Sequence, residues 1–299
     1  MDLKKLNHKI YKKMRDEKAV LWSFSSVSSY ETCPYEYYLS RVLKKKGLDN
    51  IYTKSGTLSH DLQEQFYNKE IEKKDMLYKF NYGMLEIMSK GYRFSSEKIE
   101  KSYLDNMRLY FQNFQEDNRI KSCEVFVGLP LWIYDNKLQD NYLQGWVDMV
   151  LEDENGNIHI GDFKSSTIFK GKDLLKKSKQ LILYAIAYEF LYHKKVNSIF
   201  FDFMKYAEVK IKDKKKPKIV ERKDMWLLGD DVEEIRNAYV FVELTDEIKK
   251  ETTEWFINTI HTINQDNEFD IGEDCGANSY FCNQLCGHKN DCEKRMVDY

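Results

Sequence analysis

Hydrophobic residues recur at spacings of three and four between residues 25 and about 119, with charged residues between them. This period is that of an amphipathic helix, so we expect this half of the chain to be mainly helical. The sequence has only 3 prolines and 13 glycines, and no segment repeats at a period of roughly 20 to 50 residues. The pattern therefore indicates one continuous fold.

Between about residues 123 and 163 the period shortens to that of β-strands. Three segments have this character: CEVFVGLPLWIY, YLQGWVDMVLE and NIHIGDFK. The turn signal Asn155-Gly156 separates the last two. We therefore expect three consecutive antiparallel strands.

Helical and strand patterns alternate in the rest of the chain. We predict a helix at 172–192, a strand at 198–206, a lysine-rich turn, a short strand near 218–222 and a long helix at 231–264. Strands flanked by helices favour an α/β fold with a central mixed sheet and flanking helices.

A chain of 299 residues with 42% hydrophobic side chains can bury a sizeable core. Within a single domain spanning residues 1–299, three parts are predicted. They are a mainly helical cap at 20–120, an α/β core at 121–225, and a C-terminal helix with a cysteine-rich segment at 226–299.

No run of residues approaches the roughly 18 apolar positions of a membrane helix, and the first residues lack the apolar stretch of a signal peptide. We therefore expect a cytoplasmic protein without a membrane partner. The net charge is −2, although 32% of the residues are charged, so any binding of phosphate groups must be local. Lysines cluster at 44–46, 170–179 and 210–218, where the simplest interpretation is a solvated surface.

Candidate chemistry begins in the strand at residues 158–164. Side chains alternate between the faces of a strand, so Ile158, Ile160, Asp162 and Lys164 share one side. Two nearby carboxylates with a lysine suit phosphodiester hydrolysis, because the acids hold Mg²⁺ and the lysine positions water or offsets charge.

The second carboxylate is predicted in the preceding strand. Asp148 lies opposite that strand's apolar face, so the simplest interpretation is a solvent-facing acid. A two-residue Asn155-Gly156 loop would place Asp148 and Asp162 on opposite faces. A shared site therefore requires a loop of three or five residues, or a bulge.

Two further sets of polar residues have helical spacing. Gln180 and Tyr184 are four residues apart and share one face of the predicted helix. His60 and Glu64 share a helical turn, and a neutral imidazole can complete a metal shell. A buried tyrosine, a surface glutamine and a structural histidine are the simpler alternatives.

The six cysteines form a third candidate site. Cys282, Cys286 and Cys292 are close enough to bind one metal centre, but they need a fourth ligand. Cys33 is the candidate and Cys275 the local competitor. A tetrahedral zinc site that uses Cys275 or His288 is the alternative to an iron–sulfur cluster, because both take four ligands.

Taken together, these residues resemble a known family. The motifs are S-x-S-x-x-x-x-Y-x-x-C-P-Y from Ser23, G-x-x-x-H ending at His60, G-x-x-D ending at Asp148, D-x-K from Asp162, Q-x-x-x-Y from Gln180, and the terminal cysteines. Their order along nearly the whole chain resembles the RecB-like branch of the PD-(D/E)XK nucleases. The most similar patterns are those of the AddB-type nuclease domain and the CRISPR-associated and phage RecB-like exonucleases.

The resemblance implies a restriction-endonuclease-like core with a catalytic Mg²⁺ or Mn²⁺. His60, Asp148, Asp162 and the carbonyl of Phe163 would bind this metal. Lys164 would be the catalytic lysine, and Gln180 with Tyr184 the accessory pair. The shared site also implies the longer hairpin loop or a bulge.

For the cysteines, the resemblance implies a [4Fe–4S] cluster held by Cys33, Cys282, Cys286 and Cys292. The family usually has two residues between the second and third cysteines, whereas this chain has three. Cys275 in place of Cys282, or a bulged loop, would account for the difference. Cys123 matches no family cysteine and is predicted to be a buried strand residue.

The resulting hypothesis is a metal-dependent exonuclease that acts on DNA ends, preferably single-stranded, in a bacterial, archaeal or virus-infected cell. A non-catalytic DNA-binding or assembly subunit with the same fold is the first alternative, although the joint presence of Asp148, Asp162 and Lys164 favours an enzyme. The second is a nuclease that trims ends in CRISPR adaptation. Helicases or CRISPR adaptation proteins are the corresponding partners.

Overall fold

The computed structural model describes residues 12, 14–15, 18–276 and 278–296. The first eleven residues, where the sequence lacks a signal peptide's apolar stretch, lie outside this part. Among the described residues, no helix combines the length and apolar character needed to cross a membrane.

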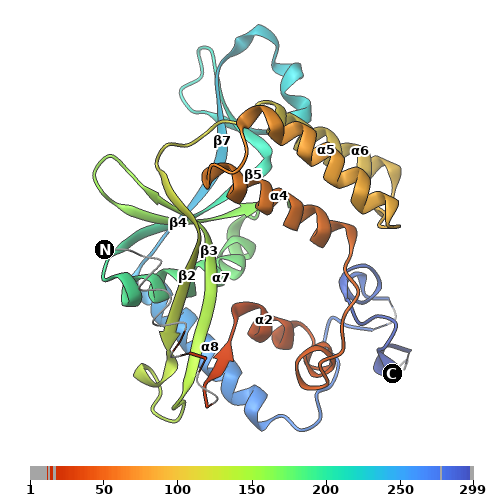
Figure 1. Cartoon of the computed structure of the whole chain (residues 1–299), viewed down its shortest axis with the longest axis vertical. Coiled ribbons are helices and arrows are strands. Elements are labelled where there is room, and N and C mark those ends of the chain that lie inside the picture. The colour runs from red at the N-terminus through yellow and green to blue at the C-terminus, as the bar shows by residue number, and fades with distance from the viewer. Residues whose placement is uncertain (1–11, 13, 16–17, 277, 297–299) are drawn as a thin grey trace.

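The helices are named in chain order with the strands (Figure 1). The α-helices are α2 (Phe24–Thr32), α3 (Pro34–Tyr37), α4 (Ile51–Tyr67), α5 (Lys73–Ser89), α6 (Glu97–Gln112), α7 (Gly171–Tyr192) and α8 (Asp246–Gln265). The short 3₁₀ and π segments are η1 (Tyr38–Val42), η2 (Leu131–Ile133), η3 (Arg222–Asp231), η4 (Phe281–Leu285) and η5 (Glu293–Met296).

A seven-stranded mixed sheet occupies the centre of the described chain. Its strands are β1 (Val20–Trp22), β2 (Ile120–Pro130), β3 (Asn141–Glu152), β4 (Ile158–Lys164), β5 (Val196–Ile211), β6 (Lys218–Glu221) and β7 (Val232–Glu243). β2, β3 and β4 pair antiparallel in succession, as predicted, and β4 pairs parallel with β5. A mixed sheet with flanking helices confirms the predicted fold class.

Helices cover both faces of this sheet and divide the core in two. On one face, α7 and α8 pack with residues such as Ile160 and Phe201. On the other, α4, α5 and α6 pack with residues such as Met149, Phe163 and Phe200 (Figure 1). The helical prediction for residues 25–119 and the helix at 172–192 are therefore confirmed.

The long helix predicted at 231–264 is wrong in its first half. Residues 232–243 form β7, which pairs antiparallel with β5, and the helix starts only at Asp246. This segment, VEEIRNAYVFVE, is rich in β-branched and aromatic side chains, which fit a pleated surface. A long partner strand provides its backbone hydrogen bonds, and β5 extends beyond the predicted 198–206 for the same reason.

The hairpin between β3 and β4 has the longer loop that a shared acidic site requires. Glu152 pairs with Ile158, which leaves residues 153–157 as a five-residue loop. Asp153 holds this loop, because its side chain accepts hydrogen bonds from the backbone N–H groups of Asn155 and Asn157 at 2.9 Å each. Gly156 has φ +80°, which a glycine adopts without strain.

A buried polar network connects α4, α6 and β5. Gln63 of α4 donates a hydrogen bond to the Tyr110 hydroxyl of α6, which donates to Asp202 of β5 at 3.2 Å. The Arg222 guanidinium lies 5.0 Å from the centre of the Tyr110 ring. Burial raises the pKa of Asp202 to about 7, because the neighbouring Arg222 only partly offsets the loss of solvation.

The raised pKa of Asp202 predicts a pH dependence of stability. The folded state holds a proton that the unfolded chain loses near pH ~4, so this group's favourable contribution disappears as the pH rises from ~4 to ~7. The expected loss is about 1.4 kcal/mol per pH unit over that window. Asp202→Asn should remove this dependence from the free energy of unfolding, measured with urea at several pH values.

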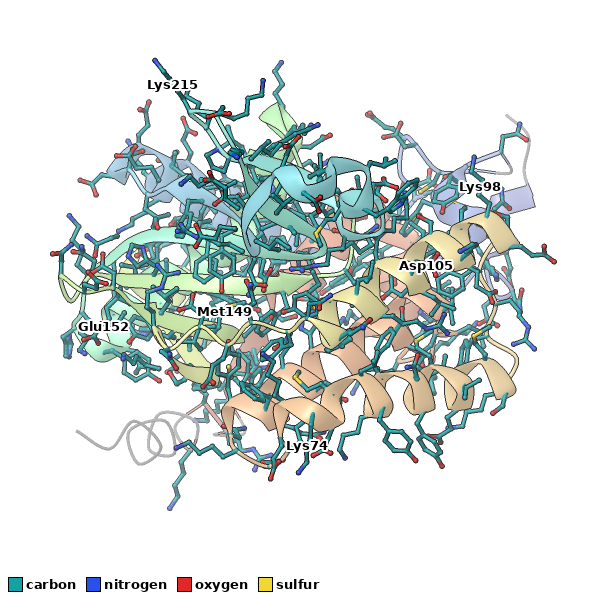
Figure 2. All side chains as sticks on the ribbon, turned by 90° about the horizontal axis from the view of Figure 1, so that it is seen from above. Lys74, Lys98, Asp105, Met149, Glu152 and Lys215 are labelled. Carbon is teal, nitrogen blue, oxygen red and sulfur yellow. The ribbon has the colours of Figure 1, made fainter. Side chains whose placement is uncertain are left out.

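Asp105→Asn is the control, because Asp105 belongs to a surface pair with Lys101 on α6 (Figure 2). It should keep the wild-type slope. A wild-type slope in Asp202→Asn would contradict the assignment of this proton to Asp202.

Candidate active site

The β3–β4 register brings the two predicted acids together. Met149 pairs with Gly161, so the next position along each strand places Asp148 across from Asp162. The Phe163 backbone N–H donates to Asp148 Oδ2 at 3.0 Å. From the sequence alone, Asp148 and Asp162 could lie on the same face or on opposite faces of the hairpin. The register shows that they lie side by side.

Two basic side chains face these carboxylates. Nδ1 of His60, from α4, lies 3.1 Å from Asp148 Oδ2, and Nζ of Lys164 lies 2.5 Å from Asp162 Oδ2. The position of His60 depends on α4, whose first turn is capped by the Asn50 side chain. It also depends on the packing of its ring against that of Phe163, with 5.9 Å between the ring centres. His60 and Glu64 were predicted to share one turn of this helix, and of the two it is His60 that makes the ion pair with Asp148.

The four charged side chains of this site shift one another's pKa values. Burial opposes a charge on His60, but the Asp148 carboxylate outweighs it and raises the pKa of His60 to about 9. Burial also acts on Asp148, where the His60 charge prevails and the pKa lies below its ordinary value. The pKa of Asp162 is raised by burial and by Asp148, and that of Lys164 is raised by Asp162 despite burial.

The donor set suits a hard divalent cation. Asp162 Oδ2 is fully buried and accepts no hydrogen bond of good angle from the described residues, although Lys164 is close. Carboxylate oxygens are the preferred ligands of Mg²⁺, and a neutral imidazole also binds Mn²⁺. Because His60 holds a proton at neutral pH, its coordination of a metal would release that proton.

No group of three or more His, Cys, Asp or Glu side chains in the described part of the chain is already arranged to hold a metal ion. At the acidic site each carboxylate instead faces a basic side chain.

Gln180 and Tyr184 lie over this site on α7. The Gln180 amide donates to the Tyr184 hydroxyl at 3.4 Å, and Tyr184 packs on β3 at Gly145. Burial raises the pKa of Tyr184 to about 12, and the Asp148 and Asp162 charges act in the same direction. Tyr184 thus lies within the electrostatic influence of the acids, and Gly145, the glycine of the G-x-x-D motif, leaves room for its ring.

The sequence analysis missed a third acid, Glu124. It lies on β2 between Cys123 and Val125, which pair with Met149 and Val147, so it lies beside Asp148. Its φ of 50° is rare for a residue other than glycine. At this point of β2 the apolar side chains change from one face of the sheet to the other, since Cys123 packs against one core cluster and Val125 belongs to the other. Burial, Asp148 and Glu64 raise the pKa of Glu124 to about 7. A single acid breaking the apolar run CEVFV was the available signal.

A second site gathers the cysteines. One cavity is lined by Cys33, Cys282, Cys286 and Cys292, together with apolar side chains such as Leu39 and Phe281. The Gly276 backbone N–H donates to Cys282 Sγ at 3.4 Å. Burial raises the pKa of Cys286 to about 11, so a ligand role would require displacement of its proton.

The competing cysteine-site residues are also close. Cys275 neighbours Cys33 and Cys282, and its thiol donates to the Thr32 carbonyl at 3.7 Å. His288 lines the cavity and is 3% exposed. Cys123 lies in strand β2 as predicted, but it is half-buried rather than buried.

The cysteine-rich segment packs on the N-terminal helices. The Tyr35 N–H donates to the Asp270 carbonyl at 3.0 Å, and the Leu48 N–H donates to the Gly287 carbonyl at 2.7 Å. Figure 1 shows this C-terminal segment beside the chain that leads into α4.

Gly145→Ala tests the packing of Tyr184. The new Cβ would overlap the Tyr184 ring, so we expect a loss of about 1–3 kcal/mol in the free energy of unfolding. If the clash is the cause, Gly145→Ala should cost much less when Tyr184→Ala is already present. Equal costs in both backgrounds, measured by urea unfolding, would contradict this packing.

The family described as the PD-(D/E)XK nuclease superfamily matches residues 21–293. Among solved structures, SSO0001 is similar, with 13% identity, 99% of this chain and 95% of that chain covered, and a TM-score of 0.37. A protein from Eubacterium rectale named as a candidate exonuclease is 11% identical, with 92% and 90% covered and a TM-score of 0.44. No curated protein matches significantly.

Proposed function

Because this chain belongs to the PD-(D/E)XK nuclease superfamily, we propose that it is a metal-dependent deoxyribonuclease that degrades DNA from its ends and prefers single strands. The observation that carries the proposal is the pairing of two adjacent carboxylates, half-buried Asp148 and buried Asp162, with His60 and Lys164. Two adjacent carboxylates of unlike pKa fit metal binding and acid–base chemistry.

The proposed roles follow from position. Asp148, Asp162, His60 and the carbonyl of Phe163 would hold Mg²⁺ or Mn²⁺, and Glu124 adds a carboxylate beside them. When bound, the metal would polarise the scissile phosphate and lower the pKa of a bound water. Lys164, freed from Asp162 by that binding, would orient the attacking water and offset negative charge on the phosphate. Gln180 and Tyr184 would position the phosphate from α7.

Asp162→Asn and Lys164→Ala should each reduce cleavage of end-labelled single-stranded DNA in Mg²⁺ or Mn²⁺ by a factor on the order of 10² or more. Progressive shortening of the labelled strand would identify an exonuclease. Asp105→Asn, on α6, is the matched control and should cleave like wild type. Wild-type rates in Asp162→Asn would refute this site, and DNA binding without cleavage in either metal would favour a non-catalytic subunit.

We also propose that the cysteine cavity holds a [4Fe–4S] cluster, with Cys33, Cys282, Cys286 and Cys292 as ligands. Four thiols around one cavity and an N–H directed at Cys282 Sγ support this assignment. The cluster would join segments about 250 residues apart and restrict the unfolded chain, as a disulfide does.

Serine substitution of each cysteine, followed by anaerobic purification, tests the ligand set. Replacing any of the four ligands should lower bound iron and destabilise the fold by several kcal/mol, on the order of a disulfide's effect. Cys275→Ser and Cys123→Ser should retain iron. Bound zinc without iron would overturn the cluster, and loss of iron in Cys275→Ser with retention in Cys282→Ser would exchange those two ligands.

A further inference from the structure

A groove opens directly beside the acidic site. It has a volume of about 730 Å³, within the roughly 300–1,000 Å³ of typical ligand sites. Residues 165–167, in the loop that follows β4, line it on one side, and Tyr52 of α4 and Tyr103 of α6 also line it. Ser165 Oγ is 4.0 Å from where a Cβ on Gly56 would lie, one helical turn before His60. Ser165 directly follows Lys164 along the chain, so the groove adjoins the end of β4 that carries the proposed catalytic lysine.

The charge of this groove differs from that of the whole chain. Among the described residues that line it, the charged ones are Lys98 and Lys205, and none carries a carboxylate. The chain as a whole has a net charge of −2. The hydroxyls of Ser102, Ser165 and neighbouring residues add hydrogen-bond donors. Such a lining favours a phosphate-bearing ligand.

An exposed aromatic residue forms part of the opposite wall. Tyr280 is 60% exposed and lines the groove together with Leu285. An exposed ring next to cationic and hydroxyl groups suits unstacked bases on a sugar–phosphate backbone. In a duplex the base faces are stacked on one another, so this ring would gain little from duplex DNA.

We propose that this groove binds the single-stranded segment of a nucleic acid and leads its backbone to Asp148 and Asp162. The inference rests on the proposed nuclease function and deepens it by assigning the strand a path. Lys98 lies in the first turn of α6, near the C-terminal segment (Figure 2). Together with Lys205 it contacts phosphates. Tyr280 stacks on a base.

The groove also connects substrate binding to the cysteine segment. Tyr280 and Leu285 lie on either side of Cys282 along the chain, and Leu285, in η4, immediately precedes Cys286. The carboxylates lie on β3 and β4, in the central sheet. The fold of the cysteine segment therefore sets one wall of the strand path, whereas the acids belong to the sheet.

The test measures binding apart from cleavage. In full-length Asp162→Asn protein, the anisotropy of a labelled oligothymidylate of about 16 nucleotides reports the dissociation constant. Tyr280→Ala should weaken binding roughly tenfold, the scale of one lost base stack. Lys98→Ala should weaken it several-fold and reduce the slope of log K against log salt by about 0.7, the share of one phosphate contact.

The matched controls are Tyr78→Ala and Lys74→Ala. Tyr78 is 71% exposed on α5, and Lys74 lies on the same helix, well apart from Lys98 (Figure 2). Both should bind like the parent protein. Unchanged binding in Tyr280→Ala and Lys98→Ala, or duplex DNA that binds as tightly as the single strand, would overturn the groove assignment.

The two proposals fail in different ways. If the wild type cleaves DNA while Tyr280→Ala and Lys98→Ala bind normally, the nuclease stands and the path is wrong. If these variants lose binding but the wild type cleaves nothing, the path stands and the nuclease proposal is wrong.

Discussion

The approach of the two proposed metal-binding carboxylates, Asp148 and Asp162, depends on the register between β3 and β4. Side chains of a strand alternate between two faces, so a slip of one residue would move Asp162 away from Asp148. The five-residue loop fixes this register, because Asp153 binds the backbone on the far side of the turn and Gly156 takes a positive φ. A surface loop thus determines whether the chain can form a two-carboxylate site.

Bringing two carboxylates together in a buried place has an electrostatic cost, and the fold offsets it with two nearby basic groups. Lys164 comes from the same strand as Asp162, whereas His60 comes from a helix about 100 residues earlier in the sequence. The orientation of α4 is therefore part of the site. Gln63, one turn after His60, connects α4 through Tyr110 to Asp202 on β5, next to Phe163 of β4.

Two segments that are far apart in the sequence also meet in this structure. The cysteine-rich segment accepts backbone hydrogen bonds from Tyr35 and Leu48, and it lines a groove with α4 and α6. Under the two proposals, the [4Fe–4S] cluster that joins the cysteine-rich segment to the N-terminal helices also holds Tyr280 and Leu285 in place, and these residues line the groove for the nucleic acid strand. Stability and substrate binding would then share one element, while the hydrolytic residues belong to the sheet.

Local sequence determined much of this protein. The periods of apolar residues identified the helices before residue 119, the helix at 171–192 and the antiparallel strands β2 to β4, because a repeat of 3.6 or 2 is a local property. Motif spacing singled out His60, Asp148, Asp162, Lys164, Gln180, Tyr184 and the cysteines, and the structure brings these residues together in two groups.

Only the tertiary structure decided the rest. Residues 232–243 are a strand because β5 offers them a partner, and no local pattern contains that partner. The common face of Asp148 and Asp162 depends on the loop register, and Glu124 joins them only through pairing of β2 with β3. The groove between α6 and Tyr280 unites residues about 180 positions apart. Sequence fixes which chemical groups are present and their local period, whereas distances between remote groups arise only when the elements pack.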